Sequence, residues 1–301
     1  APVLLYAANR IGAIVSFLHA EAGVGETSAR IADFTPHWLV VTDEHVNGVQ
    51  RIVSDKSVRG VLRCHYDDFG KKKHVRALQR MRRRFNVDQG GMRGTAARPD
   101  NGKDVLTEAP PLFSWRSFLN LESAESLPLQ SDLHVPDDHA VVLYTGGTTG
   151  PSRGVMHTNR QLTAVAFQTQ VQGPLLAGQS VLSVVPFSHG YGIAVGVHAT
   201  MAAGARSILL PHSTPRSLAR AIRHLQPEYV IGVPSTYAGL VRDRVFARTR
   251  HRPLMGAFCG GDRLPRAVRD RFETIVRRRG GAITIREGYG LTETVTACAT
   301  M

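Results

Sequence analysis

A loop rich in glycine and threonine is the first part of the sequence whose residue types could do chemistry. Residues 145–154 read TGGTTGPSRG and follow the apolar run AVVLY at 140–144. Closely spaced glycines let a backbone turn tightly and bring N–H groups near a ligand, and clustered N–H groups bind anions such as phosphate. The loop therefore predicts a phosphate site, while an ordinary surface turn stays open as the alternative. Its candidate ligand-binding residues are Thr145, Gly146, Gly147, Thr148, Thr149, Gly150 and Arg153.

The loop is not a Walker A motif, because no G-x-x-x-x-G-K-[ST] pattern fits it. The longer string YTGGTTGPSRGV resembles the phosphate loop of the acyl-adenylate superfamily, which typically reads YT[S/G]GTTGxPKGV. Three further segments resemble this family's elements in the same order. They are PFSHGYG at Pro186–Gly192, CGGDRLP at Cys259–Pro265 and EGYGLTET at Glu287–Thr294. The family includes acyl-CoA synthetases, luciferases and the adenylation domains of peptide synthetases.

The resemblance implies a role for each matched residue. The loop residues and Arg153 would cradle the β- and γ-phosphates of ATP, and Thr292 would contact the α-phosphate. Thr145 and Glu293 would lie near Mg²⁺, which takes oxygen ligands. Tyr289 would stack on adenine, and His189 would line the acyl-substrate side. The adenine pocket would be shaped by Gly260, Gly261, Asp262, Glu287, Gly288 and Gly290.

The implied reaction is activation of a carboxylic acid as an acyl-adenylate, followed by transfer to CoA. ATP, Mg²⁺ and CoA would be the cofactors and co-substrates. Ser188 stands where adenylation domains for amino acids usually carry an Asp, which disfavours an amino acid. Gly146 and the small apolar residues at 190–205 favour a fatty acid, as in bacterial long-chain fatty acid–CoA ligases. An aryl or amino acid ligase and a non-catalytic nucleotide-binding fragment remain the alternatives.

Apolar periodicity predicts an α/β fold. Short apolar runs of strand length alternate with helical patterns, which is typical of largely parallel sheets flanked by helices. The runs predict strands at 13–18, 38–41, 60–63, 140–144, 181–185, 207–210, 229–233 and 282–285. We expect two βαβ-type subdomains that form part of the family's N-terminal domain. Residues 1–172 would hold the phosphate loop, and residues 173–301 the acyl and adenine motifs. Residues 66–137 interrupt the alternation and are interpreted as an inserted surface excursion.

The net charge of +13 includes eight positive residues at 71–84, KKKHVRALQRMRRR, so we interpret the excess as a local run and not as a basic face. An amphipathic helix there could contact a membrane peripherally, at the inner membrane, but a solvated helix is the favoured interpretation. Nucleic-acid binding is disfavoured, because the run lacks interleaved aromatic residues. The oligomeric state is not indicated, and the expected partners are small-molecule substrates.

The three cysteines, Cys64, Cys259 and Cys298, have no metal or redox spacing, so we expect small buried side chains in a cytoplasmic protein. Two departures from the family are visible. Ser152–Arg153 replaces its usual Pro-Lys, which exchanges a point charge for a planar fork. The chain also ends before the family's ribose-binding Asp motif and its small C-terminal domain with the catalytic lysine. We therefore expect a fragment that is inactive on its own.

Overall fold

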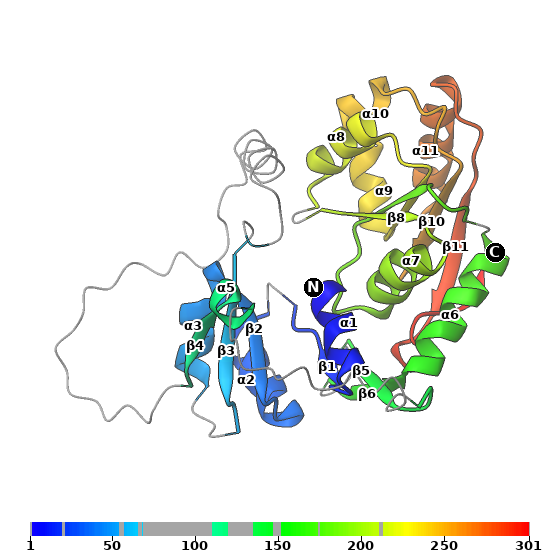
Figure 1. The fold of residues 1–301 in the computed structure, drawn as a ribbon. Helices are drawn as coiled ribbons and strands as arrows, with labels where there is room; N and C mark the ends of the chain where they lie inside the picture. Colours follow the sequence, from blue (N-terminus) through cyan, green and yellow to red (C-terminus); the bar gives the residue numbers. More distant parts are fainter. Residues whose placement is uncertain are drawn as a thin grey trace, which may run out of the picture. The chain divides into compact units, whose positions relative to one another are not determined.

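The computed structural model divides into two compact units, which are described separately (Figure 1). The first unit contains residues 1–19 and 131–301, and the second contains residues 20–130. The structure describes residues 2–19, 22–53, 57–65, 68, 110–119, 135–146, 152–173, 175–210 and 213–300. In this described part, no helix has the length and apolar character needed to cross a membrane.

The second unit is built on a parallel sheet of strand order β2-β3-β4. The strands are β2 (Trp38–Thr42), β3 (Gly60–Cys64) and β4 (Leu112–Ser114), and the helices are α2 (Val24–Phe34), α3 (Val46–Ile52) and α5 (Trp115–Leu119), with the short η1 (Asp43–His45). The rings of Phe113 and Phe118 lie 5.5 and 5.7 Å from that of Trp38. Gly60 leaves room for this cluster, because a Cβ there would meet the Trp38 ring at 2.6 Å.

The structure of residues 110–119 corrects the interpretation of residues 66–137 as an inserted surface excursion. They supply β4 and α5, so this piece completes the sheet of the second unit. The predicted basic helix within 71–84 and most of the remaining excursion lie outside the described residues, so the proposed membrane contact of this segment stays a prediction.

The first unit contains a small sheet that carries the predicted phosphate loop. Its order is β1-β5-β6, with β1 (Val15–Ser16) parallel and β6 (Gly154–Thr158) antiparallel to β5 (His139–Tyr144). Helix α1 (Pro2–Arg10) precedes β1. Helix α6 (Asn159–Gln172) starts at a capping box, in which the Thr158 side chain accepts from the Gln161 N–H and the Gln161 side chain accepts from the Thr158 N–H.

The boundary expected between residues 172 and 173 is not the boundary between the compact units. Because Val15 and Ser16 pair with Val141 and Val142, the first 19 residues join the later part of the chain. Helix α6 packs against the π-helical segment η4 (Tyr191–Ala199). This contact places residues from both sides of the expected boundary in the same unit.

A six-stranded sheet forms the larger part of the first unit, in the order β12-β11-β10-β9-β7-β8. All its pairings are parallel except that of β12 with β11, which confirms the predicted α/β class. The strands are β7 (Ser180–Ser183), β8 (Arg206–Leu209), β9 (Tyr229–Gly232), β10 (Gly256–Gly260), β11 (Ile285–Gly290) and β12 (Ala297–Thr300). The apolar runs at 181–185, 207–210 and 229–233 predict β7, β8 and β9 within two residues of their bounds. The run at 282–285 meets β11 only at Ile285, and no run predicts β10 or β12.

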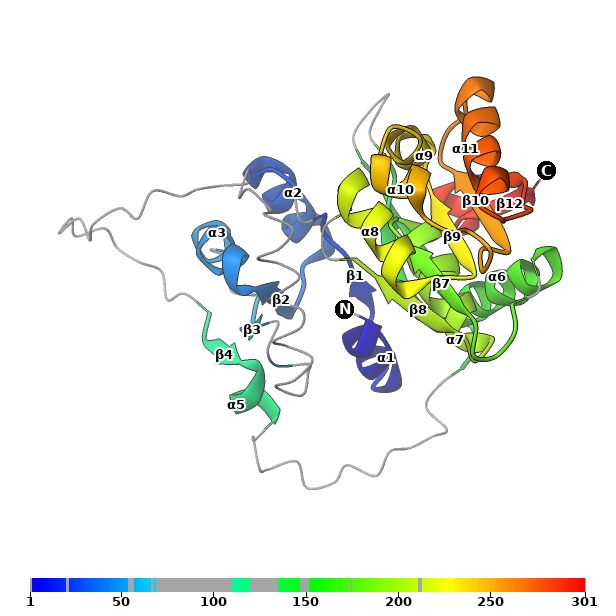
Figure 2. The ribbon, with the colours of Figure 1, turned by 90° about the horizontal axis from the view of Figure 1, so that it is seen from above.

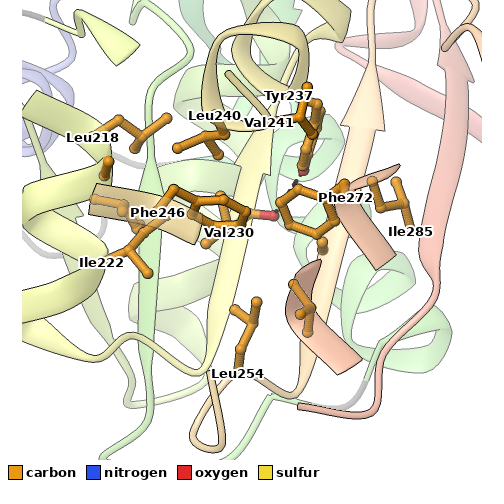
Figure 3. Close-up of a cluster of buried hydrophobic side chains, with 14 of the residues drawn as sticks. Leu218, Ile222, Val230, Tyr237, Leu240, Val241, Phe246, Leu254, Phe272 and Ile285 are labelled. Carbon is orange, nitrogen blue, oxygen red and sulfur yellow. Dashed lines mark hydrogen bonds between the residues drawn. The ribbon is translucent and has the colours of Figure 1, made fainter. Parts of the chain in front are cut away.

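Helices cover both faces of this sheet (Figures 1 and 2). Alternate strand residues face opposite ways, so Leu182 and Val230 join one buried cluster while Val181 and Ile231 join another. The first cluster also contains Tyr237, and it is shown in Figure 3. The covering helices are α8 (Pro215–Leu225), α9 (Pro234–Leu240), α10 (Arg244–Arg248) and α11 (Arg266–Arg278) on that face, and η4 with α7 (Thr200–Ala202) on the other.

Two expectations about composition need correction. Residues 213–287 hold sixteen arginines and six acidic residues, and ten of these arginines lie on α8, α10 and α11. The excess positive charge is therefore not confined to residues 71–84. Of the cysteines, Cys64 and Cys259 are buried as expected, but Cys298 is exposed on β12, an edge strand, where its thiol points to the carbonyl of Tyr289.

One buried carbonyl gives a test of the core. The Phe258 carbonyl accepts from the hydroxyls of Tyr237 (2.7 Å) and Tyr191 (3.2 Å). We expect Tyr237→Phe to lower the free energy of unfolding by about 1 kcal/mol, because Tyr191 still satisfies the carbonyl. The double variant with Tyr191→Phe should cost more than the two single changes together, since it leaves the carbonyl without a donor. Urea unfolding measures all three, and strict additivity would contradict this account.

Buried histidines give a pH test of stability. Burial lowers the pKa of His198 and of His251, so both are neutral in the folded protein at pH 7. The unfolded chain takes up these protons first, starting near the ordinary value of about 6.5. We expect the free energy of unfolding to fall as the pH drops below that value, and to fall less in His251→Gln. Urea titrations at pH 7.5 and 5.5 check this, and equal acid sensitivity of the variant would refute it.

Candidate active site

The base of the predicted phosphate loop is a closed hairpin. Tyr144 of β5 pairs with Gly154 of β6, and the Thr145 N–H donates to the Arg153 carbonyl at 3.0 Å. The Arg153 N–H donates to the Thr145 hydroxyl oxygen at 3.1 Å, and the Ser152 hydroxyl donates to the Thr145 carbonyl at 2.6 Å. These bonds fix the two ends of the loop.

The side chains at the loop base remain accessible. Gly146 and Arg153 are exposed and Thr145 is half-buried, so the guanidinium can reach an anion in solvent. Because the Thr145 oxygen already accepts one hydrogen bond, its O–H stays available as a donor. The other predicted loop residues, Gly147, Thr148, Thr149 and Gly150, lie outside the described residues, and their role stays a prediction.

Parallel pairing of β10 and β11 brings two predicted segments together. Cys259 pairs with Glu287 and Gly260 pairs with Gly288, so both segments leave the sheet at the same edge. This is the carboxyl edge of parallel strands, where ligands of open α/β sheets bind. Gly261 follows with a φ of +86°, a conformation that favours glycine at this turn. The adenine-pocket segments predicted from sequence are therefore neighbours in space.

Glu287 braces this edge from within. One carboxylate oxygen accepts from the Leu264 N–H at 3.0 Å, and the other forms an ion pair with Arg269 of α11. The carboxylate is largely buried and is occupied by these partners. Glu287 therefore shapes the predicted pocket by tying β11 to the loop after β10 and to α11.

Tyr289 and Asp262 are the members of this group whose side chains face solvent. Tyr289 is 62% exposed, an unusual state for an aromatic ring and one that leaves its face free to stack on a ligand. Asp262 is also exposed, and its carboxylate accepts from the Arg263 N–H at 2.6 Å. Gly290, at an irregularity in the pairing of β11 with β12, follows directly.

His189 lies in the turn between β7 and η4. Its Nδ1 accepts from the Tyr191 N–H at 3.1 Å, which places the proton of the neutral ring on Nε2. The residue is exposed as a whole, yet the protein packed around its ring lowers the pKa of the imidazole. At pH 7 the ring is therefore neutral and offers an N–H donor.

The turn that carries Thr292 and Glu293 docks against the His189 turn. Gly190 is in such close contact with the Val295 carbonyl that any side chain at position 190 would collide with it. Val295 has a φ of +64°, which is strained for a β-branched residue, and its side chain packs into the cluster of Leu143 and Ile193. Thr292 is half-buried and Glu293 is exposed.

Mg²⁺ is predicted from sequence to lie near two oxygen donors, those of Thr145 and Glu293. Among the described residues, no group of three or more His, Cys, Asp or Glu side chains could hold a metal. Mg²⁺ at phosphates usually takes only one or two protein ligands besides waters and phosphate oxygens. The exposed Glu293 carboxylate and the Thr145 hydroxyl fit that donor set.

A separate depression lies at the opposite edge of the large sheet, where β9, β10 and β11 begin. Its volume is about 350 Å³, and its lining includes Tyr229, Met255, Phe258 and Arg286. It contains no predicted site residue. The adenine-pocket segments predicted from sequence lie at the carboxyl edge instead, so the candidate site is placed there and not at this depression.

Two residues of the site region were missed from sequence. Tyr191 lies beside Gly260, where a Cβ would come 3.2 Å from its ring, and it donates to Phe258 of β10. His157 on β6 is 1% exposed, and burial lowers the pKa of its imidazole. A histidine in an otherwise apolar strand pattern was the available signal for His157, whereas the Tyr191 contact depends on the tertiary fold.

Comparison with known proteins agrees with this arrangement. The AMP-binding enzyme family matches residues 1–301. A long-chain-fatty-acid–CoA ligase of Bacillus subtilis (strain 168) is 30% identical over 60% of this chain and 32% of its own length. A benzoate–CoA ligase of Thauera aromatica is 30% identical over 52% of this chain and 29% of its own length. ATP-bound MatB from Rhodopseudomonas palustris superposes with a TM-score of 0.68, at 19% identity, over 99% of this chain and 48% of that protein.

The fold and the clustered segments define an α/β protein of the adenylate-forming type. The chain belongs to the AMP-binding enzyme family. It spans about a third of the length of the two CoA ligases and about half that of MatB.

The brace at Glu287 can be tested directly. We expect Glu287→Ala to lower the free energy of unfolding by about 1–3 kcal/mol, because it leaves the Leu264 N–H and Arg269 without their acceptor. Glu287→Gln keeps a neutral acceptor and should cost less. Urea unfolding of both variants is the measurement, and equal losses would contradict a role for the retained acceptor oxygen.

Proposed function

We propose that the complete protein containing this sequence activates a carboxylic acid with ATP, forming an acyl-adenylate, and then transfers the acyl group to CoA. The observation that carries the proposal is the convergence of four segments in one unit. The loop hairpin, the His189 turn, the β10–β11 edge and the 292–295 turn are linked by contacts between described residues. Membership of the AMP-binding enzyme family supports the same reaction class.

Each part of the site has a role in this reaction. Arg153 and the N–H groups of the loop neutralise the leaving pyrophosphate, because fixed donors and cations stabilise developing phosphate charge. Tyr289 stacks on adenine above the β10–β11 edge. Thr292 donates to the α-phosphate, where the acid attacks. Glu293 and Thr145 would hold Mg²⁺, which would supply positive charge to offset the negative charge of ATP. His189 keeps a neutral Nε2–H toward the acid.

For the acid, we propose a fatty acid, and an aryl acid is the second candidate. The similarity to a long-chain-fatty-acid–CoA ligase supports the first, and the similarity to a benzoate–CoA ligase supports the second. The small residues at 190–205 do not decide between them. Gly190, Gly192 and Gly196 each approach neighbouring atoms closely, so packing alone accounts for these glycines.

An acid panel tests the reaction and its substrate. With the complete protein, we expect ATP–pyrophosphate exchange that depends on a fatty acid and rises with chain length. Exchange that depends on benzoate and not on alkyl acids would replace the fatty acid proposal with the aryl one. Lack of exchange with every carboxylic acid, in folded protein that binds ATP, would contradict adenylation.

The charge at position 153 is tested by its removal. We expect Arg153→Ala to weaken ATP binding about tenfold or more, since a charged hydrogen bond to phosphate contributes about 1.5–3 kcal/mol. Arg153→Lys should retain most of the affinity. Isothermal titration with ATP and Mg²⁺ gives the constants, and Arg160→Ala is a matched control because Arg160 is exposed and pairs with Asp137. Unchanged affinity in Arg153→Ala would remove the phosphate contact.

A further inference from the structure

The depression at the amino edge of the large sheet is a cavity that the proposed function does not use. Its volume of about 350 Å³ is in the range of small-ligand sites. It is lined by the first residues of β9, β10 and β11, by the residues just before β11, and by the C-terminal end of α6. It therefore lies at the opposite end of the strands whose carboxyl ends carry the candidate active site.

Two aromatic rings and a thioether give this depression an apolar lining. Tyr229 of β9 pairs with Gly256 of β10, and Phe258 is two residues further along β10, so all three face the same side of the sheet. The Tyr229 and Phe258 rings are stacked, with centroids 6.3 Å apart and an interplanar angle of 27°. Met255 is 56% exposed, and its sulfur accepts from the Gln179 side-chain amide at 3.2 Å. An apolar body would therefore find both aromatic and aliphatic contacts here.

Two glycines leave space beside these rings. A Cβ at position 256 would come within 2.8 Å of the Tyr229 ring, and a Cβ at position 173 would come within 3.0 Å of the Phe258 ring. Gly173 is the residue that ends α6, so the backbone of the helix end lies directly next to Phe258. Any larger residue at either position would occupy the space that the depression now provides.

A single guanidinium is fixed at the same place. Arg286 of β11 pairs with Phe258, so its side chain leaves the same face of the sheet as the two rings. Its Nη1 donates to the Gln172 carbonyl at 2.8 Å, which holds the guanidinium at the end of α6. No ion pair engages Arg286 in the part of the chain that the structure describes. Because a guanidinium has five N–H donors, most of them stay available for an anion.

The surrounding charges also favour an anion. Arg252 and Arg279 are exposed, and each lies three residues before a residue that lines the depression. The nearby carboxylates are already engaged. Glu228 accepts from the N–H and the hydroxyl of Ser180 at 2.7 and 2.6 Å, and Glu287 pairs with α11 on the opposite face of the sheet. A negatively charged ligand would therefore meet cations that lack a competing partner.

We propose that this depression binds a small aromatic carboxylate, with its ring against Tyr229 and Phe258 and its carboxylate on Arg286. A planar guanidinium matches a carboxylate through two parallel hydrogen bonds, and aromatic rings stack on one another. The exposed Thr284 hydroxyl also lines the depression and adds a donor. A triphosphate carries more charge than the one arginine of the described lining offsets, so this site is not assigned to ATP. The inference does not depend on the proposed reaction.

Isothermal titration of the complete protein with 1-naphthoate, without ATP or CoA, tests the site. We expect a Kd of about 0.1–1 mM, as for other ligands of this size. Arg286→Gln should weaken binding of 1-naphthoate at least tenfold and leave binding of the neutral 1-naphthamide unchanged. Arg244→Gln is the matched control, because it removes the same charge from exposed α10 on the opposite face of the sheet. This control should bind both compounds as the unmodified protein does.

Thr284→Trp is a second, independent variant. Its indole would fill the depression, so it should abolish binding of both the acid and the amide. These readouts need no ATP, so they stand whether or not the protein adenylates an acid. Absence of 1-naphthoate binding, or binding that Arg286→Gln and Thr284→Trp both leave unchanged, would overturn the proposal. Binding of hexanoate as tight as that of 1-naphthoate would overturn the assignment of an aromatic ligand.

Discussion

The parallel register of β10 and β11 is the constraint on which the site depends. Pairing Gly260 with Gly288 brings the carboxyl ends of both strands to one edge, so the segments that follow them lie close together. Glu287 fixes this register from the side through Leu264 and Arg269. A shift of one residue would turn every β11 side chain to the opposite face of the sheet and would separate Glu287 from both partners. The exposed ring of Tyr289 would move with it.

The remaining parts of the site are attached to this edge by close contacts. Tyr191 joins the His189 turn to β10 through the Phe258 carbonyl, and Gly190 lets the same turn meet Val295. The four segments, which are separated along the chain, are thus joined within one compact unit. Val295, whose positive φ is strained, lies three residues after Thr292, the residue proposed to contact the reacting α-phosphate. Strained backbone is common at sites that must be held in one geometry.

Local sequence was sufficient for much of this fold, and the failures have physical causes. Apolar runs predicted β7, β8 and β9 correctly, because strands of a buried parallel sheet carry apolar residues on both faces. Strand β10 reads GAFCG, whose two glycines break that pattern, because Gly256 must clear the ring of Tyr229. Residues 110–119 contribute to a sheet only through pairing with β3, a partner about fifty residues away. The four motifs predicted segments that the structure brings together, but the occupied carboxylate of Glu287 and the burial of His157 depend on tertiary contacts that no local pattern encodes.

Photoaffinity labelling with an azido-adenine analogue of ATP tests the central claim most directly, namely that the carboxyl edge of β10 and β11 holds the nucleotide base. The account predicts labelled peptides that contain residues 260–264 and 287–290, with competition by unmodified ATP. Competed labelling of the depression at the opposite edge, around Tyr229 and Met255, with none at these segments, would contradict it.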